Sequence, residues 1–172
     1  EYAKKIRDLI PLDKARKSID VAPALDLVKE SPQTTHYSVM DKDGNAVSNT
    51  YTLNYTYGNG VVAAGTGIVM NNEMDDFSIN PGFQNGFGLV SGEANSVQPH
   101  KRPLSSMTPT IMLKDDKPFF VTGSPGGGMI INVVFQSLMN IAEFEMNVRE
   151  SVAVPRIHHQ WLPDAVTFEE GV

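Results

Sequence analysis

The sequence contains no cysteine, which excludes disulfide bonds, thiolate catalysis and cysteine-ligated metal sites. It also lacks clusters of lysine and arginine, and its formal net charge of −6 argues against nucleic acid as a partner. No apolar run approaches the ~18 residues of a membrane-spanning helix, so we expect no membrane partner. The 172 residues, 41% of them apolar, are enough for a domain with a sizeable core.

The first 33 residues differ in character from the rest of the chain. Residues 1–10 have helical periodicity, which ends at Pro11. Residues 13–33 contain two prolines and no sustained period, which is typical of an irregular segment. Because the first residue is Glu1 rather than Met, we expect the sequence to start inside a longer chain, with any targeting signal upstream.

Two strands are predicted next, over residues 34–40 and 46–54, where Thr, Tyr and Val are frequent. Residues 41–45 lie between them. Gly44 suits the left-handed position of a three-residue loop over residues 42–44. The chain is therefore expected to form a β-hairpin here.

The loop length sets the register, which pairs Met40 with Ala46 and Thr34 with Thr52. Because side chains alternate along a strand, one face of the hairpin is polar and rich in hydroxyl groups. That face carries Thr34, Ser48, Thr50, Thr52 and Asn54. The opposite face carries Val47, Tyr51 and Leu53 and is predicted to face the core. By itself, a polar face of this kind is more often a solvated sheet surface.

The second half of the chain predicts a further hairpin and two helices. Residues 111–113 and 119–121 are short strands around a charged turn. Glycine-rich residues 123–128 open a helix whose apolar stripe is Ile130, Val133, Val134, Leu138 and Ile141. A capping box of Asn147 and Glu150 predicts another short helix.

Seven segments resemble the γ-glutamyltranspeptidase family, in that family's order and spacing. They are Thr34-Thr35-His36-Tyr37-Ser38, residues 41–47, Tyr51-Thr52-Leu53-Asn54, residues 71–77, residues 101–107, Gly123-Ser124-Pro125-Gly126-Gly127 and residues 159–164. Each segment alone is weak evidence for the family, but seven segments in the family's order are specific for it. The chain is identified as a member of this N-terminal-nucleophile (Ntn) hydrolase family.

The resemblance implies an α+β fold, part of the Ntn-hydrolase αββα four-layer sandwich. Residues 1–33 resemble the C-terminal tail of the large subunit and its processing linker. Residues 34–172 resemble a truncated small, catalytic subunit. Most of the large subunit is missing, including an arginine that would bind the substrate carboxylate, so we expect the 172-residue chain alone to be inactive.

The same resemblance makes Thr34 the nucleophile and the Gln33–Thr34 bond a site of autocatalytic cleavage. An N-terminal threonine carries its own base, because a free α-amine has a pKa near ~8. Thr52 is implied to orient the nucleophile, and the hairpin register reaches the same neighbour independently. A Thr–Thr cross-strand pair is also an ordinary way to stabilise a sheet.

A γ-glutamyl group presents one ammonium and one carboxylate. The resemblance assigns ammonium binding to Asn54, Glu73 and Asp76, and carboxylate binding to Ser105 and Ser106. Without the resemblance, Glu73 and Asp76 are more often a solvated acidic turn, and the two serines are compatible with a polar turn after Pro103.

The resemblance places the oxyanion hole at the backbone N–H groups of Gly126 and Gly127. A phosphate loop is the rival interpretation, but no Lys-Ser or Lys-Thr follows the glycines. The family usually continues with Ser-Arg, where this chain has Gly128 and Met129. Its lid loop commonly carries Tyr where this chain has Phe87.

Neither a metal nor a cofactor is expected. His158 and His159 without further ligands are interpreted as a packing and capping pair.

The implied activity is γ-glutamyl transfer and hydrolysis of glutathione and related amides, with water, an amino acid or a peptide as acceptor. The remainder of the large subunit is the implied protein partner, and the implied location is the periplasm or outside the cell. Three alternatives stay open: a poly-γ-glutamate depolymerase, a glutaryl-cephalosporin acylase, or an inactive unprocessed fragment.

Overall fold

The computed structural model describes residues 2–8, 10–17, 34–162 and 164–171. Its helices and strands are mixed, which confirms the expected α+β class. The helices are α1 (Tyr2–Asp8), α2 (Ile130–Ala142) and α3 (Val148–Ala153), with 3-10 turns at η2 (Glu73–Asp76), η3 (Glu93–Asn95) and η4 (Gly127–Met129). The strands are β1 (Thr34–Met40), β2 (Ala46–Thr52), β3 (Thr110–Lys114), β4 (Lys117–Thr122), β5 (Ile157–His158) and β6 (Thr167–Phe168).

The register of the first hairpin, β1 with β2, is the predicted one. Met40 pairs with Ala46, and Thr34 with Thr52. In the turn, the Asp41 carboxylate accepts hydrogen bonds from the backbone N–H groups of Asp43 and Asn45, each at 2.9 Å. Gly44 has φ 85°, as the left-handed loop position requires. A slip of one residue would turn every side chain to the other face, so this turn determines where Thr34 points.

The β1–β2 hairpin turns its polar face inward, which corrects the predicted core face. Val47 and Tyr51 are 51% and 57% exposed, while Ser48 and Thr50 are half-buried. The reason is hydrogen bonding to the second hairpin, since the Ser48 hydroxyl donates to the carbonyl oxygen of Thr122 at 2.8 Å and accepts from Thr110 N–H at 3.1 Å.

His36 is held within the β1–β2 hairpin and lies against the loop that follows β4. Its ring nitrogens lie 2.7 Å from Thr50 Oγ1 and 3.0 Å from Ser38 Oγ. A Cβ atom on Gly123 would overlap this ring, so glycine is needed there for close approach. The loop after β4 thereby lies directly against the strand that begins with Thr34.

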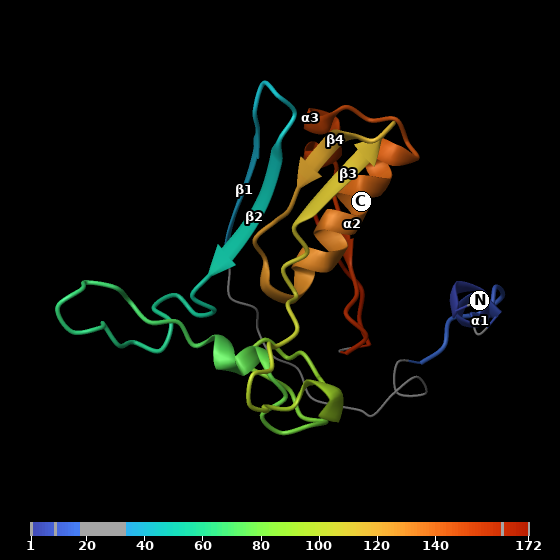
Figure 1. Ribbon diagram of the computed structural model, residues 1–172. Coiled ribbons are helices and arrows are strands. Elements are labelled where there is room, and N and C mark those ends of the chain that lie inside the picture. The colour runs from blue at the N-terminus through green and yellow to red at the C-terminus, as the bar shows by residue number, and fades with distance from the viewer. Residues whose placement is uncertain (1, 9, 18–33, 163, 172) are drawn as a thin grey trace.

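In Figure 1 the β3–β4 hairpin lies between the β1–β2 hairpin and α2. The buried apolar side chains of this part are Phe120, Ile130 and Val134. The predicted helix is confirmed as α2, and the predicted capping box at Asn147 and Glu150 is present at α3 with both of its hydrogen bonds.

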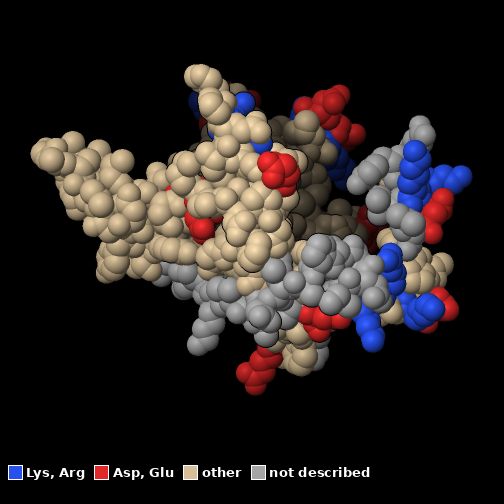
Figure 2. Space-filling model, turned by 90° about the horizontal axis from the view of Figure 1, so that it is seen from below, with Lys and Arg blue, Asp and Glu red and all other residues tan. Residues whose placement is uncertain are grey.

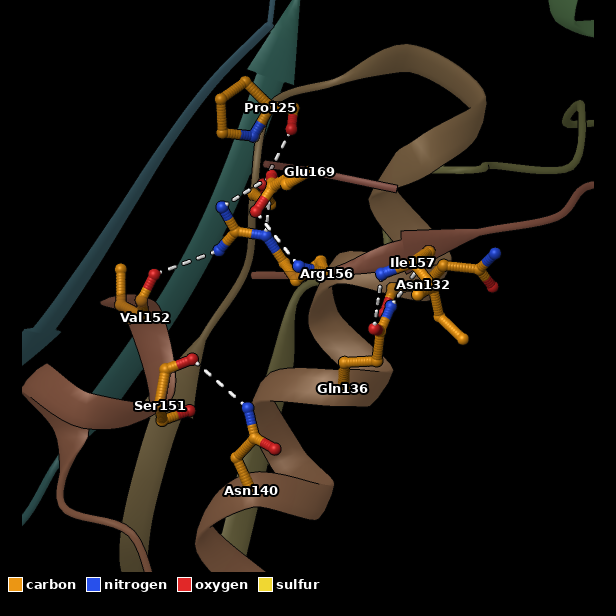
Figure 3. Close-up of polar contacts among 10 residues, drawn as sticks. Pro125, Asn132, Gln136, Asn140, Ser151, Val152, Arg156, Ile157 and Glu169 are labelled. Carbon is orange, nitrogen blue, oxygen red and sulfur yellow. Dashed lines mark hydrogen bonds and ion pairs between the residues drawn. The ribbon is translucent and has the colours of Figure 1, made fainter. Parts of the chain in front are cut away.

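Three amide side chains on one face of α2 hold the C-terminal segment (Figure 3). Asn140 Nδ2 donates to the carbonyl oxygen of Ser151 at 3.3 Å. Gln136 makes two bonds to the backbone of Ile157, donating to its carbonyl oxygen at 2.7 Å and accepting from its N–H at 3.0 Å. Asn132 Nδ2 donates to the carbonyl oxygen of His159 at 3.0 Å. Residues 151–159 are therefore attached to α2 mainly through their backbone.

Residues 55–70 form an arm that contains no charged residue, visible as the tan projection in Figure 2. Val62 and Val69 make an isolated bridge within it. Both valine side chains at positions 61 and 62 are more than half exposed. The arm connects β2 to η2, and so links Thr52 to the acidic residues that follow.

Replacing Ser48 with Ala should lower the free energy of unfolding by about 1–3 kcal/mol, because Thr110 N–H and Thr122 C=O would both lose their partner. Chemical denaturation measures this. Ser38→Ala is the matched control, since Ser38 lies on the same face but is exposed and should cost far less. Equal losses for the two variants would show that Ser48 does not join the hairpins.

Candidate active site

A pocket lies at the end of the β1–β2 hairpin where Thr34 and Thr52 are paired. Its lining contains most of the residues that the sequence singled out: Thr34, Thr52, Asn54, Glu73, Asp76, Phe87, Ser106 and Gly127. Leu89, Met107 and Ile130 complete the lining. The open space is about 30 Å³, room for about one water molecule. Four segments therefore meet at this pocket: the β1–β2 hairpin, the acidic turn η2, the lid loop (residues 81–92) and the glycine loop (residues 123–128).

Thr52 and Asn54 form the turn at the end of the strand. Asn54 N–H donates to Thr52 Oγ1 at 2.9 Å. The predicted strand extended to Asn54, but β2 ends at Thr52 because Asn54 has a left-handed backbone with φ 72°. Asn54 therefore reaches the pocket through this turn and not through strand alternation. It is buried, and its Nδ2 donates to the carbonyl oxygen of Asn72 at 3.3 Å.

Two carboxylates of η2 face the pocket together. Burial raises the pKa of Glu73 to about 7, with further contributions from the charge of Asp76, a hydrogen bond to it and the charge of Asp75. Burial also raises the pKa of Asp76. Glu73 Oε1 is buried without a hydrogen-bond partner among the described residues. A half-buried pair of carboxylates is suited to binding a cationic group.

Only one of the two serines of the predicted carboxylate site lies at the pocket. Ser106 lines the pocket, whereas Ser105 is exposed and does not. Ser105 Oγ accepts from Met107 N–H at 3.2 Å, so its hydroxyl supports the local turn. The role of both serines toward a ligand stays a prediction.

The glycine loop enters the pocket through Gly127, and Gly126 stands just outside the lining. Gly126 has φ 134° and Gly127 has φ 56°, conformations that favour glycine. Gly126 precedes the first turn of η4, which leads directly into α2. The backbone N–H groups at the start of such a turn are not needed inside the helix and can donate to an anion.

Comparisons with known proteins agree with this geometry. A family model described as Gamma-glutamyltranspeptidase matches residues 1–172. The chain belongs to the gamma-glutamyltranspeptidase family. It is 56% identical over 170 residues to a glutathione hydrolase proenzyme of Escherichia coli, covering 99% of this chain and 29% of that protein.

Solved members of the family share the fold. A mutant gamma-glutamyltranspeptidase of Helicobacter pylori superposes with a TM-score of 0.75 at 55% identity, over 78% of this chain and 72% of that one. The enzyme of Pseudomonas nitroreducens in complex with L-DON gives 0.71 at 52% identity, over 75% and 67%. The expected partial αββα sandwich is confirmed, although the chain spans under a third of the curated relative's length. The division at residues 33 and 34 stays a prediction, and Gln33 lies outside the described residues.

The departures from the family pattern fall in two places. Gly128 is buried in η4, and Met129 lines a separate cavity of about 100 Å³ beside Arg156 and Glu169. These last two form an ion pair at 2.9 Å. Met129 therefore changes packing near an existing ion pair and does not line the Thr34 pocket. Phe87 is buried at the pocket itself.

Asn95 is a positioning residue that the sequence analysis missed. It is buried, and its Nδ2 donates to the carbonyl oxygen of Asp76 at 2.7 Å. Its Oδ1 accepts from Leu104 N–H at 3.0 Å, and its carbonyl accepts from Ser78 N–H at 3.0 Å. Asn95 thereby joins the acidic turn to the loop that carries Ser106. No local pattern marks it, because its partners are 9 to 19 residues away.

The two histidines near the C-terminus serve local structure. His158 ring nitrogens lie 2.9 Å from Asn132 Nδ2 and 3.0 Å from Gln160 Oε1. His159 Nδ1 accepts from Trp161 N–H at 3.2 Å, consistent with the packing and capping interpretation. Within the described ranges, no group of three His, Cys, Asp or Glu is arranged to hold a metal, and no helix is long and apolar enough to cross a membrane.

The raised pKa of Glu73 predicts how stability depends on pH. The folded pKa of about 7 lies above the ordinary 4.5, so the contribution is fully present below pH 4.5 and is lost as pH rises through 7. Glu73→Gln should therefore melt at a higher temperature than the wild type at pH 8, by roughly 2–4 °C, with a smaller gain at pH 4.5. Thermal melts at both values measure this, with exposed Glu93→Gln as control. A gain independent of pH would contradict the assignment.

Proposed function

We propose that this chain carries the nucleophile and much of the donor site of a γ-glutamyltransferase and glutathione hydrolase. The observation that supports this best is one pocket that unites Thr34, the carboxylates of Glu73 and Asp76, and Gly127. The relatives named glutathione hydrolase proenzyme agree with it. Glutathione and related γ-glutamyl amides are the proposed donors, and no metal or cofactor is required.

The proposed reaction begins when the Gln33–Thr34 bond breaks. The freed α-amine of Thr34 then takes the proton from its own hydroxyl, whose oxygen attacks the γ-carbonyl carbon of the donor. Backbone N–H groups at Gly126 and Gly127 stabilise the oxyanion, and loss of one such donor typically costs about 3 kcal/mol. The leaving amine takes the proton and departs, leaving a γ-glutamyl ester on Thr34. Water, an amino acid or a peptide then attacks the ester.

The acid pair favours a donor with a free α-ammonium. Glutathione has this group next to the reacting carbonyl chain, whereas a glutaryl side chain lacks it. Inner residues of a poly-γ-glutamate chain have their α-nitrogen tied up in an amide. A glutaryl acylase or a polymer-specific depolymerase would leave the buried acceptor of Glu73 without a cation.

The remainder of the precursor's large subunit is the proposed protein partner. The apolar outer face of the β1–β2 hairpin gives it a surface to cover, with Tyr37, Val39, Val47 and Tyr51 all 48% or more exposed. A monomeric protein rarely leaves such a contiguous face uncovered. An inactive, unprocessed fragment is therefore the expected state of this chain without that partner. The proposed location is the periplasm or the exterior, supported by the family resemblance, and cell fractionation tests it.

Replacing Thr34 with Ala in the complete protein should abolish both self-cleavage and γ-glutamyl-anilide turnover, because one hydroxyl serves both steps. Denaturing gels and release of the anilide report the two. Thr35→Ala is the control, since Thr35 lies on the opposite face of the strand and does not line the pocket. A T34A protein that still splits into two subunits would refute the assignment.

Replacing Asp76 with Asn should lower kcat/KM for a γ-glutamyl anilide at least about tenfold, since a charged hydrogen bond contributes ~1.5–3 kcal/mol. The variant keeps the side-chain shape, so the charge alone is removed. With the matching glutaryl anilide, which has no ammonium, the loss should nearly vanish. Equal losses on both substrates would assign Asp76 to the fold or to the nucleophile.

A further inference from the structure

The lid loop, residues 81–92, is a tightly bonded unit whose tip covers the pocket. Gly82 N–H donates to Ser91 O at 3.0 Å, and Asn85 N–H donates to Leu89 O at 2.9 Å. Asn85 Oδ1 accepts from the N–H groups of Phe87 and Leu89 at 2.9 and 3.0 Å. A loop with these internal bonds keeps its shape, so its position depends on what holds its tip.

Asp75 holds the tip from the acidic turn. Its Oδ2 accepts from Gly86 N–H at 3.0 Å, and its carbonyl oxygen accepts from Asn85 Nδ2 at 3.4 Å. Asp75 is separate from the neighbouring Glu73 and Asp76, because it does not line the nucleophile pocket.

Tyr55 holds the tip from the other side. Its ring lies 5.6 Å from the Phe87 ring between centroids, at an interplanar angle of 55°, a favourable tilted pair. Its own backbone N–H is fixed by Asn72 Oδ1 at 3.1 Å. Since Tyr55 directly follows the buried Asn54, this contact joins the lid to the strand turn beside the nucleophile.

Gly86 lies next to both Asp75 and Tyr55. A Cβ atom there would overlap the Tyr55 hydroxyl, and would lie 2.7 Å from Tyr55 Cζ and 2.9 Å from Asp75 Oδ2. The backbone of Gly86 is not in the left-handed region, so other residues could adopt it. Glycine is needed here for space alone, and the space is filled by Tyr55.

We infer that Tyr55, Asp75 and Gly86 form a latch that holds the lid with Phe87 over the pocket, and thereby limits access of water to the acyl group on Thr34. This inference rests on the proposed function and adds positioning residues to it. In this chain Phe87 has no hydroxyl with which the lid could be bonded to the pocket, and the Tyr55 ring supplies the contact instead. A lid that opens more often admits water, which competes with amine acceptors for the ester.

The test is a double-mutant cycle in the complete protein, with Gly86→Ala, Tyr55→Ala and the double variant. Gly86→Ala should speed hydrogen exchange of lid amides roughly fivefold or more, and should raise the ratio of hydrolysis to transfer several-fold. In the Tyr55→Ala background, the overlap with the ring is gone and the 2.9 Å approach to Asp75 Oδ2 remains, so adding Gly86→Ala should change either readout by a clearly smaller factor than it does in the wild-type background. Gly92→Ala is the matched control, since it lies in the same loop with nothing within 4 Å of its Cβ position.

Equal exchange rates for Gly86→Ala and Gly92→Ala would overturn the latch. So would an effect of Gly86→Ala that is just as large without the Tyr55 ring. Hydrogen exchange needs no substrate, so it tests the latch even if the wild-type protein turns over no γ-glutamyl donor. That last result would refute the proposed function separately.

Discussion

The pairing of Thr34 with Thr52 is the contact on which the rest of the site depends, and it is fixed by a turn six residues along the strand. Asp41 binds two backbone N–H groups of that turn, and Gly44 takes the left-handed position. With the register set, the hydroxyl-bearing face can meet the edge of the second hairpin through Ser48. The glycine loop follows that second hairpin, so it lies beside Thr34 as a result of the same alignment.

The pocket contains two carboxylates, whose like negative charges repel each other. Glu73 and Asp76 are held close together, and the lid leaves only a small space beside Thr34. Such an arrangement has a cost in stability, which Asn95 and the internal bonds of the lid offset by fixing the acidic turn and the loops around it. A site whose charged side chains are already in place needs little rearrangement when a charged ligand binds.

Local features of the sequence predicted local structure well. The turn at residues 41–45, the apolar stripe of α2 and the capping box at Asn147 each depend on neighbours within a few residues, and each is confirmed. The burial of the β1–β2 hairpin was predicted wrongly, because alternation distinguishes two faces but does not say which one meets another element. The end of β2 was also predicted wrongly, because the left-handed backbone of Asn54 ends the strand two residues early. Asn95 and the fit of Tyr55 against Gly86 depend on partners far along the chain, which no single-sequence pattern reveals.

The amide side chains of α2 have a consequence for how the C-terminal segment can evolve. Asn140 and Gln136 bind main-chain groups of Ser151 and Ile157, which are the same whatever the side chains are. Most positions between them can therefore accept substitutions without losing their attachment, provided the backbone path is kept. Amino-acid substitutions among related proteins should be concentrated in residues 151–159. The three amide positions on α2, which are Asn132, Gln136 and Asn140, should resist replacement even by residues of similar polarity.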